Sequence, residues 1–287
     1  MLHLCYNATM VVSVSRRCDI PRFQFKWFMG RVGAGFVNVP NPYNARQIKR
    51  VSLVPAAEGM KPEDGVDIFV FWTREPKNIL AKADELTERG FLFYVMVTLT
   101  GYPDILEPFM VPTPKVLATI KKLAQKIGPE RVIWRYDPII FTDVTDGDFH
   151  RANFNSLAQE LAGSVRRVII SLYDEYRETK KRIEFRESRG ELRMIDIGDG
   201  LLGLLADLAK SAEAAGMEIQ SCAEREDFSS IGIKPGACID AVLIEKLFGL
   251  KSGGKDKNQR PYCMCCKSTD IGSYGACTAG CVYCYAQ

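Results

Sequence analysis

An alternation of short apolar runs with amphipathic segments constrains the fold of this 287-residue chain most strongly. The apolar runs, which predict strands, are 10–15, 35–39, 66–72, 91–99, 131–136, 167–171 and 217–221. Segments with apolar residues at helical spacing lie between several of them, at 76–89, 113–127, 148–162 and 201–215. Several runs are apolar on both faces of the pleat, as expected for parallel strands that are covered on both sides. The sequence therefore predicts an α/β fold, as a complete or partial parallel (β/α) barrel.

Polar residues follow many of the predicted strands. In parallel barrels the chemistry lies at the C-terminal ends of the strands, so these positions supply the candidate binding residues Arg16, Arg17, Thr98, Thr100, Arg135, Asp137, Ser171 and Glu224. Alternation along a strand places Arg135 and Asp137 on one face. A rim ion pair with no further role explains any single one of these residues equally well. Several charges that converge on one mouth favour a functional site.

The composition restricts the cellular setting and the partners. The N-terminal segment has no basic leader before its apolar run, and no stretch approaches the roughly 18 to 20 apolar residues of a membrane span. We therefore expect a cytoplasmic protein with no membrane partner. The net charge is only +3, from 38 Lys and Arg against 35 Asp and Glu, so charge does not predict a nucleic-acid partner.

Six of the ten cysteines lie within residues 263–287. A disulfide scaffold is typical of short secreted chains, so metal or cluster binding is the leading explanation here. The segment 252–260 has the composition of a linker, although a basic loop that touches substrate is the alternative. It divides an α/β body, residues 1–250, from a cysteine-rich tail, residues 251–287, which we expect to pack on the barrel mouth.

The end of the tail contains Cys277, Cys281 and Cys284 in a C-x3-C-x2-C spacing. Three thiolates this close can bind three irons of a [4Fe-4S] cluster and leave the fourth iron open to a chelating ligand. Structural zinc usually takes four ligands, and the only histidines, His3 and His150, are distant in sequence. Catalytic zinc with three thiolates and a water is a weaker alternative.

A second set of cysteines is spread along the sequence. Cys222 follows the last predicted strand, Cys238 precedes a helix-like segment, and Cys263, Cys265 and Cys266 follow the linker. Four of them would complete a second, auxiliary [4Fe-4S] cluster, which we favour over a four-thiolate zinc site. Spacing alone does not choose between Cys265 and Cys266. Near the N-terminus, Cys5 is better interpreted as a free thiol.

The C-x3-C-x2-C spacing, with Gly280 and with Tyr283 before the last cysteine, resembles the cluster loop of the radical SAM superfamily. In that superfamily the open iron chelates the amino and carboxylate groups of S-adenosylmethionine (SAM). The loop usually follows the first barrel strand, whereas here it lies at the C-terminal end of the sequence.

A longer resemblance covers the chain from about Val11 to Ala286. The segments 15–21, 70–73, 98–102, 134–138 and 259–286 resemble the family called domain of unknown function 1848. That family implies a radical-SAM-like cysteine cluster near the C-terminus, and its Cys-x-Cys pattern favours Cys263 with Cys265. This chain departs from the family at Cys18, where Thr is more frequent, so Cys18 is not treated as a ligand.

These resemblances imply an iron–sulfur enzyme that reductively cleaves SAM and starts radical chemistry on a substrate that they do not identify, either a small molecule or one of unknown class. The candidate binding residues would contact SAM or substrate, and the pair Arg16 and Arg17 suits a carboxylate or phosphate, with a salt bridge to Asp19 as the alternative. A reducing protein such as a flavodoxin or ferredoxin would supply electrons.

Two other functions stay open at this stage. The tail loop also resembles that of spore photoproduct lyase, which suggests a nucleic-acid lesion as substrate, although the near-neutral charge argues against it. The chain could instead be a non-catalytic zinc or iron–sulfur module for binding or redox sensing, which would leave the polar strand ends unexplained.

Overall fold

The main sheet of this computed structural model consists of parallel strands only. The structure describes residues 9–42 and 44–287, so the predictions for the N-terminal segment, His3 and Cys5 lie outside the described residues. Within these ranges eight strands pair in the order β10-β1-β4-β5-β6-β7-β8-β9. Their bounds are Val11–Val14 (β1), Ile68–Thr73 (β4), Leu92–Thr98 (β5), Val132–Ile139 (β6), Arg167–Leu172 (β7), Glu218–Cys222 (β8), Lys234–Gly236 (β9) and Thr269–Asp270 (β10). The order does not close on itself, so the predicted α/β fold is confirmed as a parallel sheet compatible with a partial barrel.

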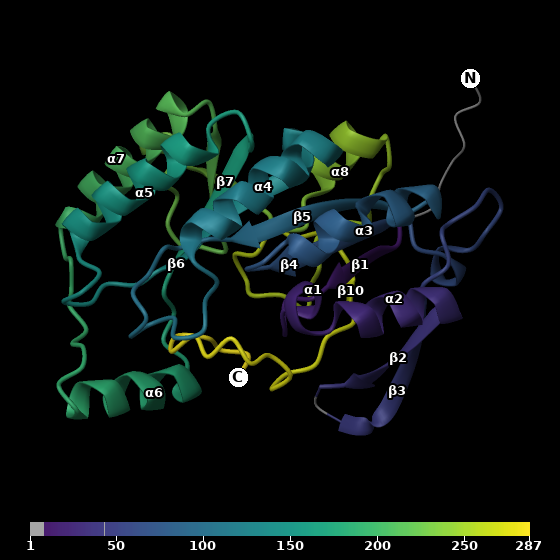
Figure 1. Cartoon of the computed structure of the whole chain (residues 1–287), viewed down its shortest axis with the longest axis horizontal. Helices are drawn as coiled ribbons and strands as arrows, with labels where there is room; N and C mark the ends of the chain where they lie inside the picture. Colours follow the sequence, from purple (N-terminus) through teal and green to yellow (C-terminus); the bar gives the residue numbers. More distant parts are fainter. Residues whose placement is uncertain (1–8, 43) are drawn as a thin grey trace.

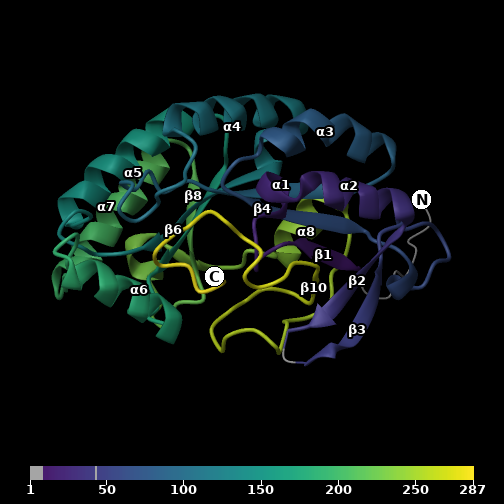
Figure 2. The same ribbon diagram turned by 60° about the horizontal axis from the view of Figure 1, so that its bottom comes forward.

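Helices cover the convex face of this sheet. Figure 2 shows α3, α4, α5 and α7 as an arc around the strands. The helices are α1 (Ile20–Phe23), α2 (Phe25–Ala34), α3 (Lys77–Glu88), α4 (Thr113–Ile127), α5 (Gly147–Leu161), α6 (Arg177–Ser188), α7 (Gly200–Ala214) and α8 (Ala241–Phe248), with short 3₁₀ turns at Pro62–Asp64, Pro129–Arg131 and Ser229–Ile231. The four segments predicted as helices correspond to α3, α4, α5 and α7. Their apolar residues recur at helical spacing and are buried against the sheet, as with Val116, Ile120 and Leu123 of α4.

Apolar side chains pack on both faces of the sheet, as the continuous apolar runs predict. In β4, Phe69 and Phe71 belong to the large cluster under the helices. Ile68 and Val70 belong instead to a smaller cluster on the concave face, which also contains Cys222 and Cys238. Successive strand residues point to opposite faces, so the concave face receives every second side chain.

The run 35–39 forms a strand outside the parallel sheet. β2 (Phe36–Asn41) pairs antiparallel with β3 (Asn44–Ser52) in a separate hairpin. In β2 only Val37 and Val39 are buried, so one face packs on the protein while the other faces solvent, as is typical of antiparallel hairpins.

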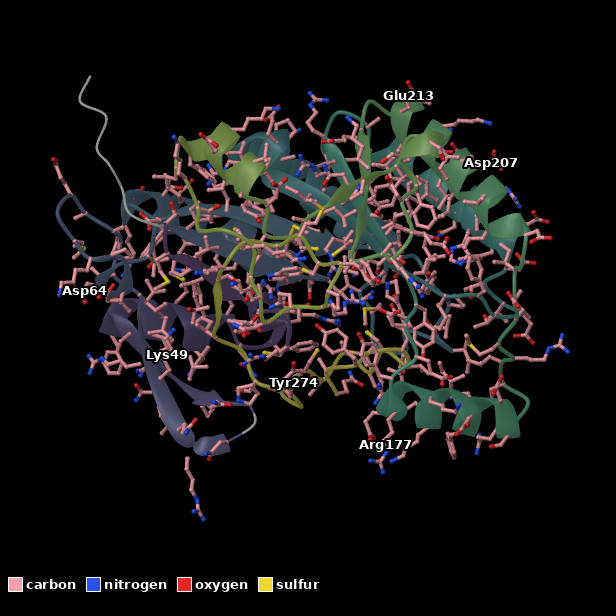
Figure 3. The ribbon with its side chains drawn as sticks, turned by 180° about the vertical axis from the view of Figure 1, so that it is seen from behind. Lys49, Asp64, Arg177, Asp207, Glu213 and Tyr274 are labelled. Carbon is pink, nitrogen blue, oxygen red and sulfur yellow. The ribbon has the colours of Figure 1, made fainter. Side chains whose placement is uncertain are left out.

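The cysteine-rich tail lies across the concave side of the sheet, at the C-terminal ends of the strands. β10 pairs with β1, the Ile271 N–H donates to the Ser13 carbonyl at 3.1 Å, and the Val282 N–H donates to the Leu106 carbonyl at 3.0 Å. In Figure 1 the end of the tail, in yellow, passes between α6 and the hairpin of β2 and β3. Figure 3 shows the same from behind, with Tyr274 of the tail between Lys49 of the hairpin and Arg177 of α6.

Among the described residues, no helix combines the length and the apolar character that crossing a lipid bilayer requires.

Candidate functional site

A cavity of about 560 Å³ lies between the C-terminal ends of the strands and the tail. Its volume is in the range of about 300 to 1,000 Å³ that is typical of small-molecule sites. Six of the eight predicted binding residues line it, namely Arg16, Arg17, Thr98, Arg135, Asp137 and Ser171. All seven predicted metal-binding cysteines line it too, namely Cys222, Cys238, Cys263, Cys265, Cys277, Cys281 and Cys284. The fold therefore brings residues from both ends of the chain to one place.

The polar residues at the strand ends form a connected row across three neighbouring strands. Arg135 of β6 forms an ion pair with Asp137. The Arg135 Nη1 donates to the Thr98 hydroxyl of β5 at 3.3 Å, and the Ser171 hydroxyl of β7 donates to Asp137 at 2.7 Å. The row fixes the orientation of the two charged groups at the wall of the cavity.

Two predicted binding residues do not line the cavity. The buried Thr100 hydroxyl donates to Glu107 at 2.5 Å. Glu224 accepts a hydrogen bond from the Leu172 N–H at 2.9 Å. Both side chains thus bind protein groups: Thr100 binds Glu107, and Glu224 binds the backbone at the end of β7.

Trp72, at the end of β4, lies between two arginines. The guanidinium carbons of Arg16 and Arg135 are 5.7 Å and 4.8 Å from the centre of its ring. The Arg16 Nε, Arg135 Nε and Trp72 Nε1 atoms are buried and find no hydrogen-bond acceptor within the described part of the chain. Buried donors are normally satisfied, so these three indicate that an acceptor or anion belongs in the cavity.

Cys277, Cys281 and Cys284, which we call the tail triad, lie on one loop that faces the cavity. Burial raises the pKa of Cys281 to about 12; nearby Arg74 opposes this, and Glu107, Cys284 and Cys277 add to it. The three thiols are therefore electrostatic neighbours. A donor set of three neighbouring sulfurs beside a cavity fits a cluster with one open iron.

The tail loop is fixed by hydrogen bonds to residues of the body, and Arg74 and Tyr283, which form one of these bonds, also line the cavity. Arg74 Nη1 pairs with Glu107 at 2.8 Å, and Arg74 Nη2 donates to the Tyr283 hydroxyl at 2.5 Å. The Tyr283 hydroxyl in turn donates to Glu107. Arg182 of α6 donates to the carbonyls of Val282 and Cys284. The aromatic residue before the last cysteine thus positions the loop.

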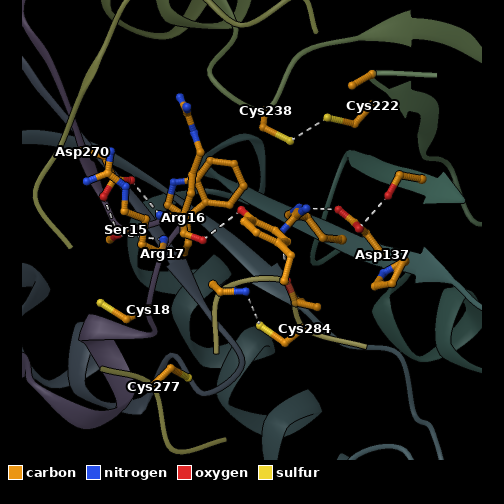
Figure 4. A pocket seen from close by; sticks show the side chains of 18 of the residues that line it. Ser15, Arg16, Arg17, Cys18, Asp137, Cys222, Cys238, Asp270, Cys277 and Cys284 are labelled. Atoms are coloured by element: carbon orange, nitrogen blue, oxygen red, sulfur yellow. Dashed lines mark hydrogen bonds and ion pairs between the residues drawn. The ribbon is translucent and has the colours of Figure 1, made fainter. Parts of the chain in front are cut away.

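Cys18 also lines the cavity, on the side of the tail triad. Burial raises the pKa of its thiol, and the charge of Cys277 is among the further causes. Figure 4 shows Cys18, Cys277 and Cys284 on one side of the cavity. One sequence signal for this residue is its position in the loop after β1, next to Arg17.

Cys222, Cys238, Cys263 and Cys265, which we call the inner quartet, meet on the concave face. Their thiols are linked in a chain of contacts: Cys222 Sγ lies 3.3 Å from Cys238 Sγ, and Cys265 is hydrogen-bonded to both Cys238 and Cys263. The two hydrogen bonds lower the pKa of Cys265. Cys266 lies beside Ser252 instead, so the structure separates the two adjacent cysteines.

In residues 9–42 and 44–287, no group of three or more Cys, His, Asp or Glu side chains is arranged so that it could hold a metal ion without side-chain movement. In the inner quartet the thiols touch one another.

A comparison with protein families gives one match, to the model described as "Domain of unknown function (DUF1848)", over residues 11–286. The chain belongs to this family. The match spans both the strand ends and the tail, so all the cysteines of the cavity lie within the DUF1848 domain.

Comparisons with individual proteins add little to the DUF1848 assignment. No curated protein matches the chain. One solved structure that matches comes from work on inhibition of the pneumococcal virulence factor StrH and on N-glycan recognition and hydrolysis. The identity is 9%, the match covers 75% of this chain and 52% of that chain, and the TM-score is 0.27. This chain thus spans about half the length of that structure, and a score this low supports no functional argument.

Proposed function

We propose that this DUF1848 protein is an iron–sulfur enzyme of the radical SAM type that acts on a small-molecule substrate. One observation carries the proposal: the tail triad and a row of oriented polar side chains face the same cavity at the C-terminal ends of parallel strands. This is the end of a (β/α) barrel at which chemistry takes place.

The chemistry of the donor set supports a cluster with three protein ligands. The tail triad offers only sulfur, and iron–sulfur clusters are held by Cys thiolates. When bound by the tail triad, such a cluster would supply the electron for reductive cleavage of SAM. All other tasks fall to the chain's own residues.

Those tasks are positioning and shielding. Tyr283 and its partners Arg74 and Glu107 keep the tail loop against the strand ends. Arg135 and Asp137 offer a cation and an anion at fixed places on the wall, suited to the carboxylate and amino groups of an amino acid such as the methionine part of SAM. Residues of the tail line the cavity, where they would help to keep water from the reacting groups.

A small-molecule substrate agrees with the size and charge of the site. A cavity of about 560 Å³ suits a cofactor with a small partner, whereas a nucleic-acid duplex needs an extended basic surface. The near balance of 38 basic and 35 acidic residues offers little excess positive charge for such a surface.

The test is product analysis under anaerobic conditions. Reconstituted protein with dithionite and SAM should form 5′-deoxyadenosine, and Cys281→Ala should abolish this product because it removes a cluster ligand. Cys266→Ala is the matched control, since Cys266 is equally buried and lies outside the cavity lining.

Unchanged 5′-deoxyadenosine formation by Cys281→Ala would show that the tail triad is not the SAM site. Iron in the wild-type protein without any SAM cleavage would instead favour a binding or redox module.

A further inference from the structure

The inner quartet joins parts of the chain that are far apart in sequence. Cys222 ends β8, Cys238 follows β9, and Cys263 and Cys265 belong to the tail. The exposed fractions of their side chains are 8%, 3%, 6% and 3%, so all four thiols are withdrawn from solvent. A free cysteine packs as a small apolar side chain and needs no other sulfur beside it. Packing alone therefore does not explain why four buried thiols lie together.

The spacing of the thiols favours a single ion over a cluster. Zinc holds its sulfurs at about 2.3 Å in a tetrahedron, so neighbouring sulfurs lie roughly 3.8 Å apart. Cys222 Sγ and Cys238 Sγ are 3.3 Å apart, and small side-chain rotations would open this distance to the tetrahedral value. In a [4Fe-4S] cluster each cysteine binds a different iron, which requires sulfurs that are much farther apart.

Positively charged side chains lie beside the inner quartet and would balance the negative charge of four thiolates around one ion. Four thiolates around Zn²⁺ carry a net charge of −2, and two arginines face them. The charge on Arg16 interacts with Cys265, Cys238 and Cys263, while Arg135 interacts with Cys222 and Cys238.

Both arginines keep a buried Nε–H that finds no acceptor within the described ranges. Thiolate sulfurs accept such hydrogen bonds, and the Ile239 N–H already donates to Cys265 Sγ at 3.3 Å. Donors of this kind orient and stabilise metal-bound thiolates. In Figure 4 Arg16 and Asp137 lie between the Cys222–Cys238 pair and the cysteines of the other side.

We propose that the inner quartet binds one Zn²⁺ ion, with four thiolate ligands and with Arg16 and Arg135 as counter-charges. Binding displaces four thiol protons and changes no oxidation state. The ion would join the edge of the sheet at β8 and β9 to the start of the tail, and so would hold the tail over the cavity. The inference is independent of the proposed function, because zinc would depend on the inner quartet and iron on the tail triad.

The test is metal analysis of the full chain, expressed with zinc and iron in the medium and purified anaerobically. Wild-type protein should contain one zinc per chain. Cys265→Ala should lose that zinc, whereas the adjacent Cys266→Ala should keep it. The two sites are equally buried, at 3% and 2% exposure, so the packing loss is matched.

A measurement on the wild-type protein covers the case in which Cys265→Ala does not fold. Zinc X-ray absorption should show four sulfur neighbours at about 2.3 Å. Nitrogen or oxygen ligands, zinc retained by folded Cys265→Ala, a Cys222–Cys238 disulfide in place of metal, or iron bound by the inner quartet would each overturn the proposal.

Discussion

The Tyr283 hydroxyl is a single buried group that ties the cysteine loop to the body of the protein. It lies between the charged side chains of Arg74 and Glu107, and burial raises its pKa well above the usual value. The hydroxyl therefore stays protonated at neutral pH and donates to Glu107.

Tyr283→Phe removes this donor and leaves the ring in place. Because hydrogen bonds to charged groups contribute about 1.5 to 3 kcal/mol, we expect the free energy of unfolding to fall by about 2 kcal/mol. Urea denaturation measures the loss. The control is Tyr274→Phe, whose ring is 52% exposed and which should unfold as the wild type does; equal stability of both variants would show that the Tyr283 hydroxyl does not hold the loop.

A second residue gives a pH dependence. His150 is fully buried between the Tyr136 hydroxyl, at 2.8 Å, and the Ile140 carbonyl, at 3.1 Å. Burial lowers the pKa of His150 from 6.5 to about 4. Since the unfolded chain takes up the proton first as the pH falls, the stability contributed by the neutral ring is complete above pH 6.5 and is lost between pH 6.5 and about 4.

The loss should approach roughly 3 kcal/mol, from about 1.4 kcal/mol for each pKa unit. His150→Gln lacks the titrating ring, so the stability difference between wild type and this variant should shrink as the pH falls from 7.5 to 4. Denaturation at a series of pH values measures it. A difference that is constant with pH would contradict the buried, neutral state of His150.

At the scale of elements, the tail is held to β1 by one carboxylate. Asp270 of β10 accepts hydrogen bonds from the hydroxyls of Ser13 and Ser15, at 2.8 and 2.6 Å, and from the N–H groups of Arg16 and Gly272, at 2.8 and 2.9 Å. β10 has only two residues, so the strand pairing is short, and this carboxylate adds three hydrogen bonds between the tail and residues 13–16.

Asp270→Ala leaves four partners of the carboxylate without an acceptor. We expect a loss of about 3 kcal/mol in the free energy of unfolding and faster proteolytic cleavage within residues 251–260, because the tail would detach more often. Asp199→Ala is the control, since Asp199 is exposed and caps its helix without a side-chain hydrogen bond. Wild-type cleavage rates in Asp270→Ala would contradict the role of this carboxylate.

The elements differ in how far the sequence determines them. The long strands of the sheet could be predicted because they are apolar on both faces, and α4 because its buried residues recur at helical spacing. β9 and β10, with three and two residues, could not, because they exist only through pairing with distant strands. The polar helix α6 buries only two residues and offers too weak an apolar pattern.

Some features of the site could likewise be predicted from the sequence, and others could not. The position of Arg135 and Asp137 on one face follows from alternation along a strand, and their pairing was foreseeable. The position of Trp72 between Arg16 and Arg135 was not foreseeable, since its two partners come from elsewhere in the chain, the loop after β1 and strand β6. Sequence spacing did not show which of Cys265 and Cys266 joins the inner quartet. The path of the tail past Ile239 decides this, because it turns Cys265 towards the quartet and Cys266 towards Ser252.

At the scale of the whole molecule, one cavity combines two sets of cysteines with different arrangements. The inner quartet is in mutual contact on the concave face, and the tail triad lies on one loop. We therefore propose a structural ion for the first set and a cluster for the second. Each set should lose its metal without affecting the other.

The most direct measurement is the iron and zinc content of the triple variant Cys277→Ala, Cys281→Ala, Cys284→Ala beside the wild type, both purified and reconstituted anaerobically. We expect about four irons and one zinc per chain in the wild type, and one zinc with no iron in the triple variant. A triple variant that still holds about four irons would contradict the claim that the tail triad binds the cluster.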